Sequence, residues 1–122
     1  MAAVNLLALD IGTSSCKGAV YQPDGQLAAE ASAAYSVQRP APLTVEQQPD
    51  DWWSAVVTVC RELLQSVPAV SIAGIGLCGQ VPTMLLVNDA GQALGAAITW
   101  QDRRAEAEAV WLREQVGADR LR

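Results

Sequence analysis

The feature that most constrains the fold is a short, almost wholly apolar run near the N-terminus, residues 4–10 (VNLLALD), which ends in an aspartate. A run of this length and composition predicts a buried central strand. The turn signal Gln-Pro-Asp-Gly at residues 22–25 separates two further predicted strands, residues 17–21 and 26–35. Together the three segments predict an antiparallel meander.

The rest of the chain alternates helical and extended patterns. Apolar residues recur at helical spacing from Asp50 to a limit at Pro68, and a second helix is predicted between a cap at Asp102 and a stop at Gly117. Extended segments are predicted at residues 70–77, 83–87 and 94–99, the last two flanking a hairpin turn at residues 88–91. Hairpins combined with crossover helices indicate the α/β class, with a mixed β-sheet and flanking helices.

Composition excludes several classes of function. Of the 122 residues 51% are hydrophobic, enough for one compact domain, and thirteen acidic residues against eight basic ones give a net charge of −5. An acidic surface argues against nucleic acid or an anionic membrane as the main partner. Because no apolar run approaches the roughly 20 residues of a membrane span and the sequence shows no secretory signal, we expect a cytoplasmic location.

The chain has no histidine, and its three cysteines, Cys16, Cys60 and Cys78, are widely spaced. This excludes catalysis by a histidine base, a Ser-His-Asp triad and most zinc sites within these residues. We expect the cysteines to be free thiols.

The segment from Asp10 to Lys17 (DIGTSSCK) is the most informative for chemistry. Its aspartate ends a predicted strand, and Gly12 opens a hydroxyl-rich turn in which backbone N–H groups, Thr13 and Ser14 could bind phosphate oxygens. Lys17 adds a positive charge, and Asp10 is placed to hold Mg²⁺ through water. An ordinary β-turn beside a solvated aspartate explains this motif alone about equally well.

A second glycine motif, residues 74–79 (GIGLCG), matches the Gly-x-Gly-x-x-Gly fingerprint of dinucleotide-binding domains. That fingerprint requires a helix directly after the glycines, whereas here a β-rich run and a hairpin turn follow. A dinucleotide-binding domain is therefore a minor alternative.

Two further segments carry groups suited to sugars. The Gln80 amide can both donate to and accept from a hydroxyl, the Trp100 ring can pack on the C–H face of a sugar, and Asp102 could bond hydroxyls. Taken singly, Trp100 is better explained as a core aromatic and Asp102 as a helix cap.

In combination these motifs resemble the N-terminal part of the FGGY carbohydrate kinases, and the order is most similar to xylulokinase-like members. The resemblance covers essentially the whole chain and rests on four segments in order: residues 10–17 (DIGTSSCK), 46–53 (EQQPDDWW), 76–80 (GLCGQ) and 97–104 (AITWQDRR). It implies a ribonuclease H-like (actin-like ATPase) fold with two domains facing a cleft, in which ATP and Mg²⁺ phosphorylate a sugar or polyol.

The resemblance also implies roles for individual residues. Asp10 would lie near the metal and Gly12, Thr13, Ser14 and Lys17 near the ATP phosphates. The sugar site would be lined by Gln80, Val81, Pro82, Trp100 and Asp102. Xylulokinases typically have Gln-Met-His-Gly where this chain has residues 80–83 (QVPT), and glycerol kinases have Arg-Glu at positions 81 and 82. The substrate is therefore open, with a pentulose or related sugar as the first choice.

The family's catalytic base is an aspartate that would lie beyond Arg122. We therefore expect residues 1–122 to be an incomplete N-terminal domain, inactive alone, with apolar sheet surface left uncovered. A homodimer is compatible with this expectation. The alternative from another class is a non-catalytic actin-fold module that binds a nucleotide or a partner.

Overall fold

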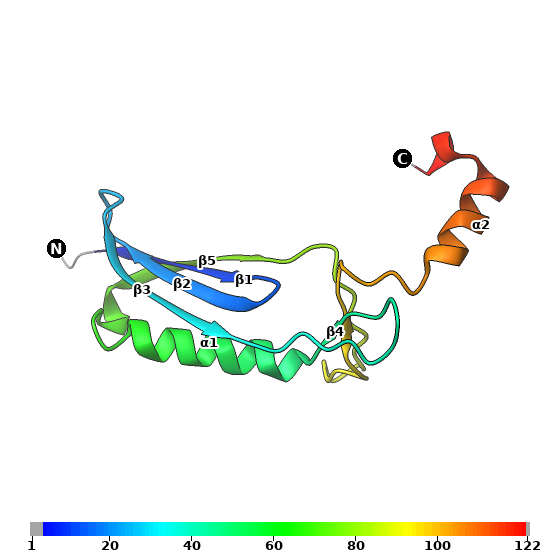
Figure 1. Cartoon of the computed structure of the whole chain (residues 1–122). Helices are drawn as coiled ribbons and strands as arrows, with labels where there is room; N and C mark the ends of the chain where they lie inside the picture. The colour runs from blue at the N-terminus through cyan, green and yellow to red at the C-terminus, as the bar shows by residue number, and fades with distance from the viewer. Residues whose placement is uncertain (1–3, 122) are drawn as a thin grey trace.

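The computed structural model describes residues 4–121 and is built on a four-stranded sheet (Figure 1). Its strands, in the spatial order β3-β2-β1-β5, are β1 (Asn5–Ile11), β2 (Ser15–Tyr21), β3 (Leu27–Ala34) and β5 (Ile72–Gly79). β1 pairs antiparallel with β2 and parallel with β5, and β2 pairs antiparallel with β3. The predicted meander and the mixed sheet are confirmed.

Helix α1 (Pro49–Leu63) covers one face of this sheet, mainly over β2 and β3 (Figure 1). Proline at the start and two aspartates in the first turn suit a helix N-terminus. The helix buries Ala55, Val59 and Leu63 in a core shared with strand residues of β1 and β2. Gly18 permits the close approach, because a Cβ atom there would lie 3.0 Å from Leu63 Cδ1 and still closer to Val59.

The sheet is covered only in part by the described residues. Along β1, Leu7 and Leu9 are buried on the α1 side, whereas Leu6, 56% exposed, alternates with them. Ile75 and Leu77 of β5 pair with Leu7 and Leu9 but lie beyond the edge of α1 and are exposed. The expected uncovered apolar surface is confirmed, and β1 is buried on one side.

A small second sheet pairs β4 (Glu46–Gln47) with β6 (Ala97–Ile98). The turn predicted at residues 88–91 is present, with the Gly91 N–H donating to the Asn88 carbonyl at 2.9 Å. The prediction of continuous strands at residues 83–87 and 94–99 was wrong, because only isolated bridges join Met84 to Ile98 and Val87 to Ala93. The second flank pairs instead with β4, which lies among residues 37–49, where the sequence predicted no helix or strand.

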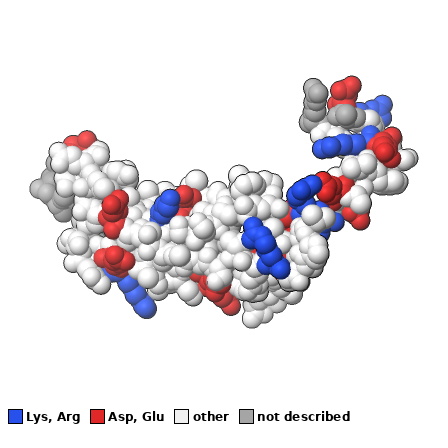
Figure 2. Space-filling model, in the orientation of Figure 1, with Lys and Arg blue, Asp and Glu red and all other residues white. Residues whose placement is uncertain are grey.

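Helix α2 (Glu106–Val116) projects away from the sheet (Figure 1), and charged side chains gather around it (Figure 2). The prediction of Asp102 as its N-terminal cap was wrong: the helix begins four residues later, and the Asp102 carboxylate accepts hydrogen bonds from Val45 and from the neighbouring Arg104. Gly117, with φ of 84°, ends the helix as predicted. The apolar residues of α2, among them Ala109, Leu112 and Val116, are all exposed.

Two short 3₁₀ helices, η1 (Ala69–Ser71) and η2 (Ala118–Arg120), complete the described elements. None of the helices within residues 4–121 is long and apolar enough to cross a membrane. Cys16, Cys60 and Cys78 are free thiols, as expected.

The Gly-x-Gly-x-x-Gly motif lies inside β5 and not in a turn that opens a helix. After β5 the chain enters an irregular segment at residues 80–83. A pyrophosphate-binding helix N-terminus is therefore missing at this motif, and the dinucleotide-binding interpretation is wrong.

Candidate active site

The candidate metal and phosphate residues lie on the sheet face opposite α1. Asp10 of β1 pairs directly with Lys17 of β2, which in turn pairs with Ser32 of β3. All three side chains line an open cavity of about 790 Å³ over the sheet. An acidic and a basic residue therefore occupy neighbouring strand positions on an accessible surface, which suits binding of a metal–phosphate group.

The turn between β1 and β2 forms the second part of this site. The Gly12 N–H donates to the Ser15 carbonyl at 3.0 Å, which closes the turn. A Cβ atom at Gly12 would lie 3.2 Å from that carbonyl oxygen, so glycine fits the tight path. Within residues 4–121 nothing accepts a hydrogen bond from the backbone N–H groups of Thr13 or Ser14, which leaves both available to an anion.

Tyr35 holds this turn from β3's C-terminal side, a role that the sequence did not reveal. Its hydroxyl donates to the Gly12 carbonyl, and its backbone N–H donates to the Ser14 carbonyl at 3.1 Å. Burial, together with Cys16 and Asp10, raises the pKa of the Tyr35 hydroxyl to about 12. The phenol therefore stays protonated, and able to donate, across the physiological range.

Gln47 is the other residue that sequence reasoning missed. It is fully buried on β4, and its side-chain amide donates to the Thr13 carbonyl at 2.7 Å and accepts from the Gln80 amide at 2.6 Å. The only sequence signal was its place in the segment 46–53, which carried the family resemblance without a role for this residue.

Trp100 joins the predicted phosphate and sugar segments. Its indole N–H donates to Thr13 Oγ1 at 3.0 Å, across 87 positions of sequence. The ring is 50% exposed, so one face remains available for packing on the C–H groups of a sugar. Thr13, Gln80 and Trp100, predicted from separate motifs, are thus brought together.

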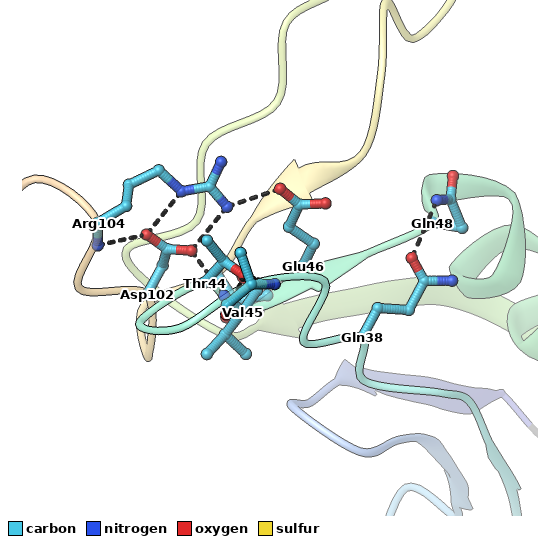
Figure 3. Close-up of polar contacts among 9 residues, drawn as sticks. Gln38, Thr44, Val45, Glu46, Gln48, Asp102 and Arg104 are labelled. Atoms are coloured by element: carbon cyan, nitrogen blue, oxygen red, sulfur yellow. Dashed lines mark hydrogen bonds and ion pairs between the residues drawn. The ribbon is translucent and has the colours of Figure 1, made fainter.

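Asp102 has a different environment (Figure 3). Its Oδ2 accepts from the Val45 N–H at 2.6 Å and from the Arg104 guanidinium at 2.8 Å, while Oδ1 accepts from the Arg104 backbone and Nε. Arg104 also pairs with Glu46 at 2.6 Å. The Arg104 hydrogen bonds hold the pKa of Asp102 well below its usual range, and those partners raise the pKa of Arg104. All acceptor positions of the Asp102 carboxylate are thus occupied by hydrogen bonds from Val45 and Arg104. A contact between Asp102 and a sugar stays a prediction.

Gln80, Val81 and Pro82 follow β5 directly. The Gln80 N–H donates to the Ile11 carbonyl at 2.9 Å, which extends the pairing with β1. Val81 and Pro82 are joined by a cis peptide bond and are exposed. They offer apolar surface beside the Gln80 amide.

Magnesium is compatible with Asp10 as its one protein carboxylate. Among residues 4–121 no cluster of three or more histidine, cysteine or acidic side chains could enclose a metal ion. Mg²⁺ keeps several waters and commonly takes only one or two carboxylates plus substrate phosphates, so a single exposed carboxylate beside a phosphate-binding turn suits it.

Comparison with known proteins decides the family. The model for the N-terminal domain of the FGGY family of carbohydrate kinases matches residues 5–122. The chain belongs to this family. The mixed sheet and its helix are accordingly the start of an actin-like ATPase fold, as the sequence motifs implied.

The relatives of this FGGY chain include kinases for different substrates. A glycerol kinase of Bradyrhizobium diazoefficiens is 40% identical over 102 residues, 81% of this chain and 20% of that protein. A xylulose kinase of Klebsiella pneumoniae is 32% identical over 114 residues, 93% of this chain and 24% of that protein. The crystal structure of xylulose kinase from Rhodospirillum rubrum superposes with a TM-score of 0.88 at 28% identity, covering 94% and 24% of the two chains. The chain thus spans about a fifth to a quarter of the length of these proteins.

Proposed function

We propose that these residues form the N-terminal part of a kinase that transfers the γ-phosphate of ATP, with Mg²⁺, to a hydroxyl group of a sugar or polyol. The observation that carries this proposal is the hydrogen bond from Trp100 to Thr13, because it joins a phosphate-binding turn to an exposed indole suited to sugars. Phosphoryl transfer depends mainly on positioning and electrostatic stabilisation, which such a junction supplies.

Each group has a distinct part in this proposal. Asp10 holds Mg²⁺ through water, and the turn at Gly12, Thr13 and Ser14 binds ATP phosphates together with Lys17. Gln80, Val81, Pro82 and Trp100 line the sugar site, with Asp102 at its border. The catalytic base and most of the adenosine site would come from residues beyond Arg122, and a cytoplasmic location and a homodimer remain predictions.

A pentulose or related sugar is the proposed substrate. Glycerol kinases carry an Arg-Glu pair at the positions of Val81 and Pro82. The side chains of Val81 and Pro82 can neither donate nor accept a hydrogen bond. The percentage of identical residues does not decide between the two substrates, since both glycerol kinases and xylulose kinases are relatives of this chain.

The test is an assay of ADP formation by the full-length protein with a panel of ketoses, aldoses and polyols. We expect Mg²⁺-dependent turnover on a pentulose, less on glycerol, and none by the 122-residue chain alone. Turnover by the isolated chain would overturn the assignment of a partial site. Nucleotide binding without turnover on any panel member would favour the non-catalytic module instead.

A further inference from the structure

The side chain of Gln47 uses its complete hydrogen-bonding capacity inside the protein. Its Nε2 donates to the carbonyls of Thr13 at 2.7 Å and Ser36 at 3.3 Å. Its Oε1 accepts from the Trp52 indole at 3.2 Å and from Gln80 Nε2 at 2.6 Å. A primary amide has two donor hydrogens and two acceptor positions, so all four are satisfied in a side chain with no exposed surface.

The partners of Gln47 also fix which end of its amide is which. Carbonyl oxygens at Thr13 and Ser36 only accept, so the nitrogen must face them. The Trp52 indole only donates, so the oxygen must face it. A flipped Gln47 amide would place two carbonyl oxygens against an oxygen and leave the Trp52 N–H without its acceptor.

This fixed orientation determines what Gln80 can do. Because Gln47 presents an oxygen, Gln80 must present its nitrogen, which leaves the second Nε2 hydrogen and Gln80 Oε1 for other groups. That oxygen is buried and has no partner among residues 4–121, and the same holds for Thr83 Oγ1. Gln80 and Thr83 both line a cavity of about 250 Å³ beside Trp52. A buried polar atom without a partner destabilises the protein, and a ligand hydroxyl in this cavity would supply the missing hydrogen bond.

We propose that Gln47 is a positioning residue that holds the phosphate turn at Thr13 and sets Gln80 to meet the substrate through its oxygen. Gln80 then accepts a hydrogen bond from one hydroxyl of the sugar or polyol, and the Thr83 hydroxyl lies beside it. This inference rests on the proposed kinase function, and it names the polarity of one substrate contact. One buried amide thereby connects the phosphate-binding and sugar-binding segments.

The first experiment tests the positioning without substrate. In the full-length protein labelled with ¹⁵N-tryptophan, Gln47→Met should shift the indole signals of Trp52, which loses its acceptor, and of Trp100, which contacts Thr13. The matched control is Gln48→Met, because Gln48 is exposed and its side chain bonds only Gln38 among the described residues 4–121. Unchanged Trp52 and Trp100 signals in Gln47→Met would overturn the positioning role.

The second experiment tests the acceptor role with substrate analogues in which each hydroxyl is replaced by hydrogen or by fluorine. Fluorine accepts but cannot donate, so at one position both analogues should bind roughly tenfold or more weaker than the parent sugar. Gln80→Met should abolish that penalty. Gln47→Met should let Gln80 rotate, so that the fluoro analogue binds better than the deoxy one.

The outcomes separate this inference from the proposed function. A penalty that persists in Gln80→Met, or fluoro analogues that bind like the parent sugar at every position, would overturn the acceptor role while the kinase function stands. Failure to bind or phosphorylate any sugar or polyol would overturn the function and the acceptor role together. The indole signals would still report whether Gln47 holds the turn.

Discussion

The two α-helices carry similar charges at their ends but have opposite environments. α1 buries Ala55, Val59 and Leu63 against the sheet, whereas α2 buries none of its side chains, and its Leu112 is 42% exposed. Both helices have acidic first turns and a basic residue in the last turn. The difference teaches that propensity and terminal charges can specify a helix, while its contribution to stability depends on the surface against which it packs.

The largest effect is expected from removing a core contact of α1. Leu63 is only 2% exposed, so Leu63→Ala should lower the free energy of unfolding by about 2–5 kcal/mol, through lost burial and the cavity left behind. Urea denaturation of wild type and variant measures the change. A loss below about 1 kcal/mol would show that α1 does not anchor the core.

Gly18→Ala tests the closeness of the same contact. The added methyl group would collide with Val59 and lie 3.0 Å from Leu63 Cδ1, so we expect a loss of about 1–3 kcal/mol by overpacking. Gly76→Ala is the matched control, because a Cβ atom there meets nothing within 4 Å. Equal stability of the two variants in urea would contradict the packing of α1 on β2.

Tyr35→Phe extends the comparison from the covered core to the turn beside it. Loss of the hydrogen bond to Gly12 should cost about 1 kcal/mol at neutral pH. Because folding raises the pKa of this hydroxyl from 10.0 to about 12, its stabilisation is complete below pH 10 and is lost as pH rises through 12. Denaturation from pH 8 to 12 should therefore show the difference between wild type and variant shrinking. A stability difference that stays constant from pH 8 to 12 would contradict the hydrogen bond from the Tyr35 hydroxyl to Gly12.

The smallest effect is expected from Leu112→Ala, the same chemical change as in α1 but on α2. With 42% of Leu112 exposed and no buried neighbour on its helix, the 122-residue chain should change by no more than about 0.5 kcal/mol. A loss comparable to that of Leu63→Ala would mean that α2 packs on the chain in solution, and would remove the contrast between the helices.

The parts of the fold that depend on nearby residues were predictable from the sequence. The meander and α1 follow from a short apolar run, turn residues and helical spacing, and Gly117 ends α2 because glycine readily adopts a positive φ. Long-range pairing was not predictable: β6 pairs with β4 some fifty positions away, and Asp102 accepts a hydrogen bond from the Val45 N–H in place of capping a helix. No local pattern encodes such partners.

The candidate site divides in the same way. Asp10, Thr13, Gln80 and Trp100 were found because their side chains suit phosphate or sugar chemistry at the ends of predicted strands. Gln47 and Tyr35 escaped, because their roles consist of buried hydrogen bonds to a turn that lies far away in sequence. Whether the predicted residues touch ATP or sugar stays a prediction.

The central claim is that the surface around Asp10 supports phosphoryl transfer to a sugar or polyol. The most direct measurement is the rate of ADP formation by full-length Asp10→Ala, compared with Asp89→Ala, an exposed aspartate in the turn at residues 88–91. We predict that Asp10→Ala lowers turnover at least about a hundredfold, because Mg²⁺ loses its carboxylate, while Asp89→Ala matches wild type. Unchanged turnover in Asp10→Ala would contradict the account.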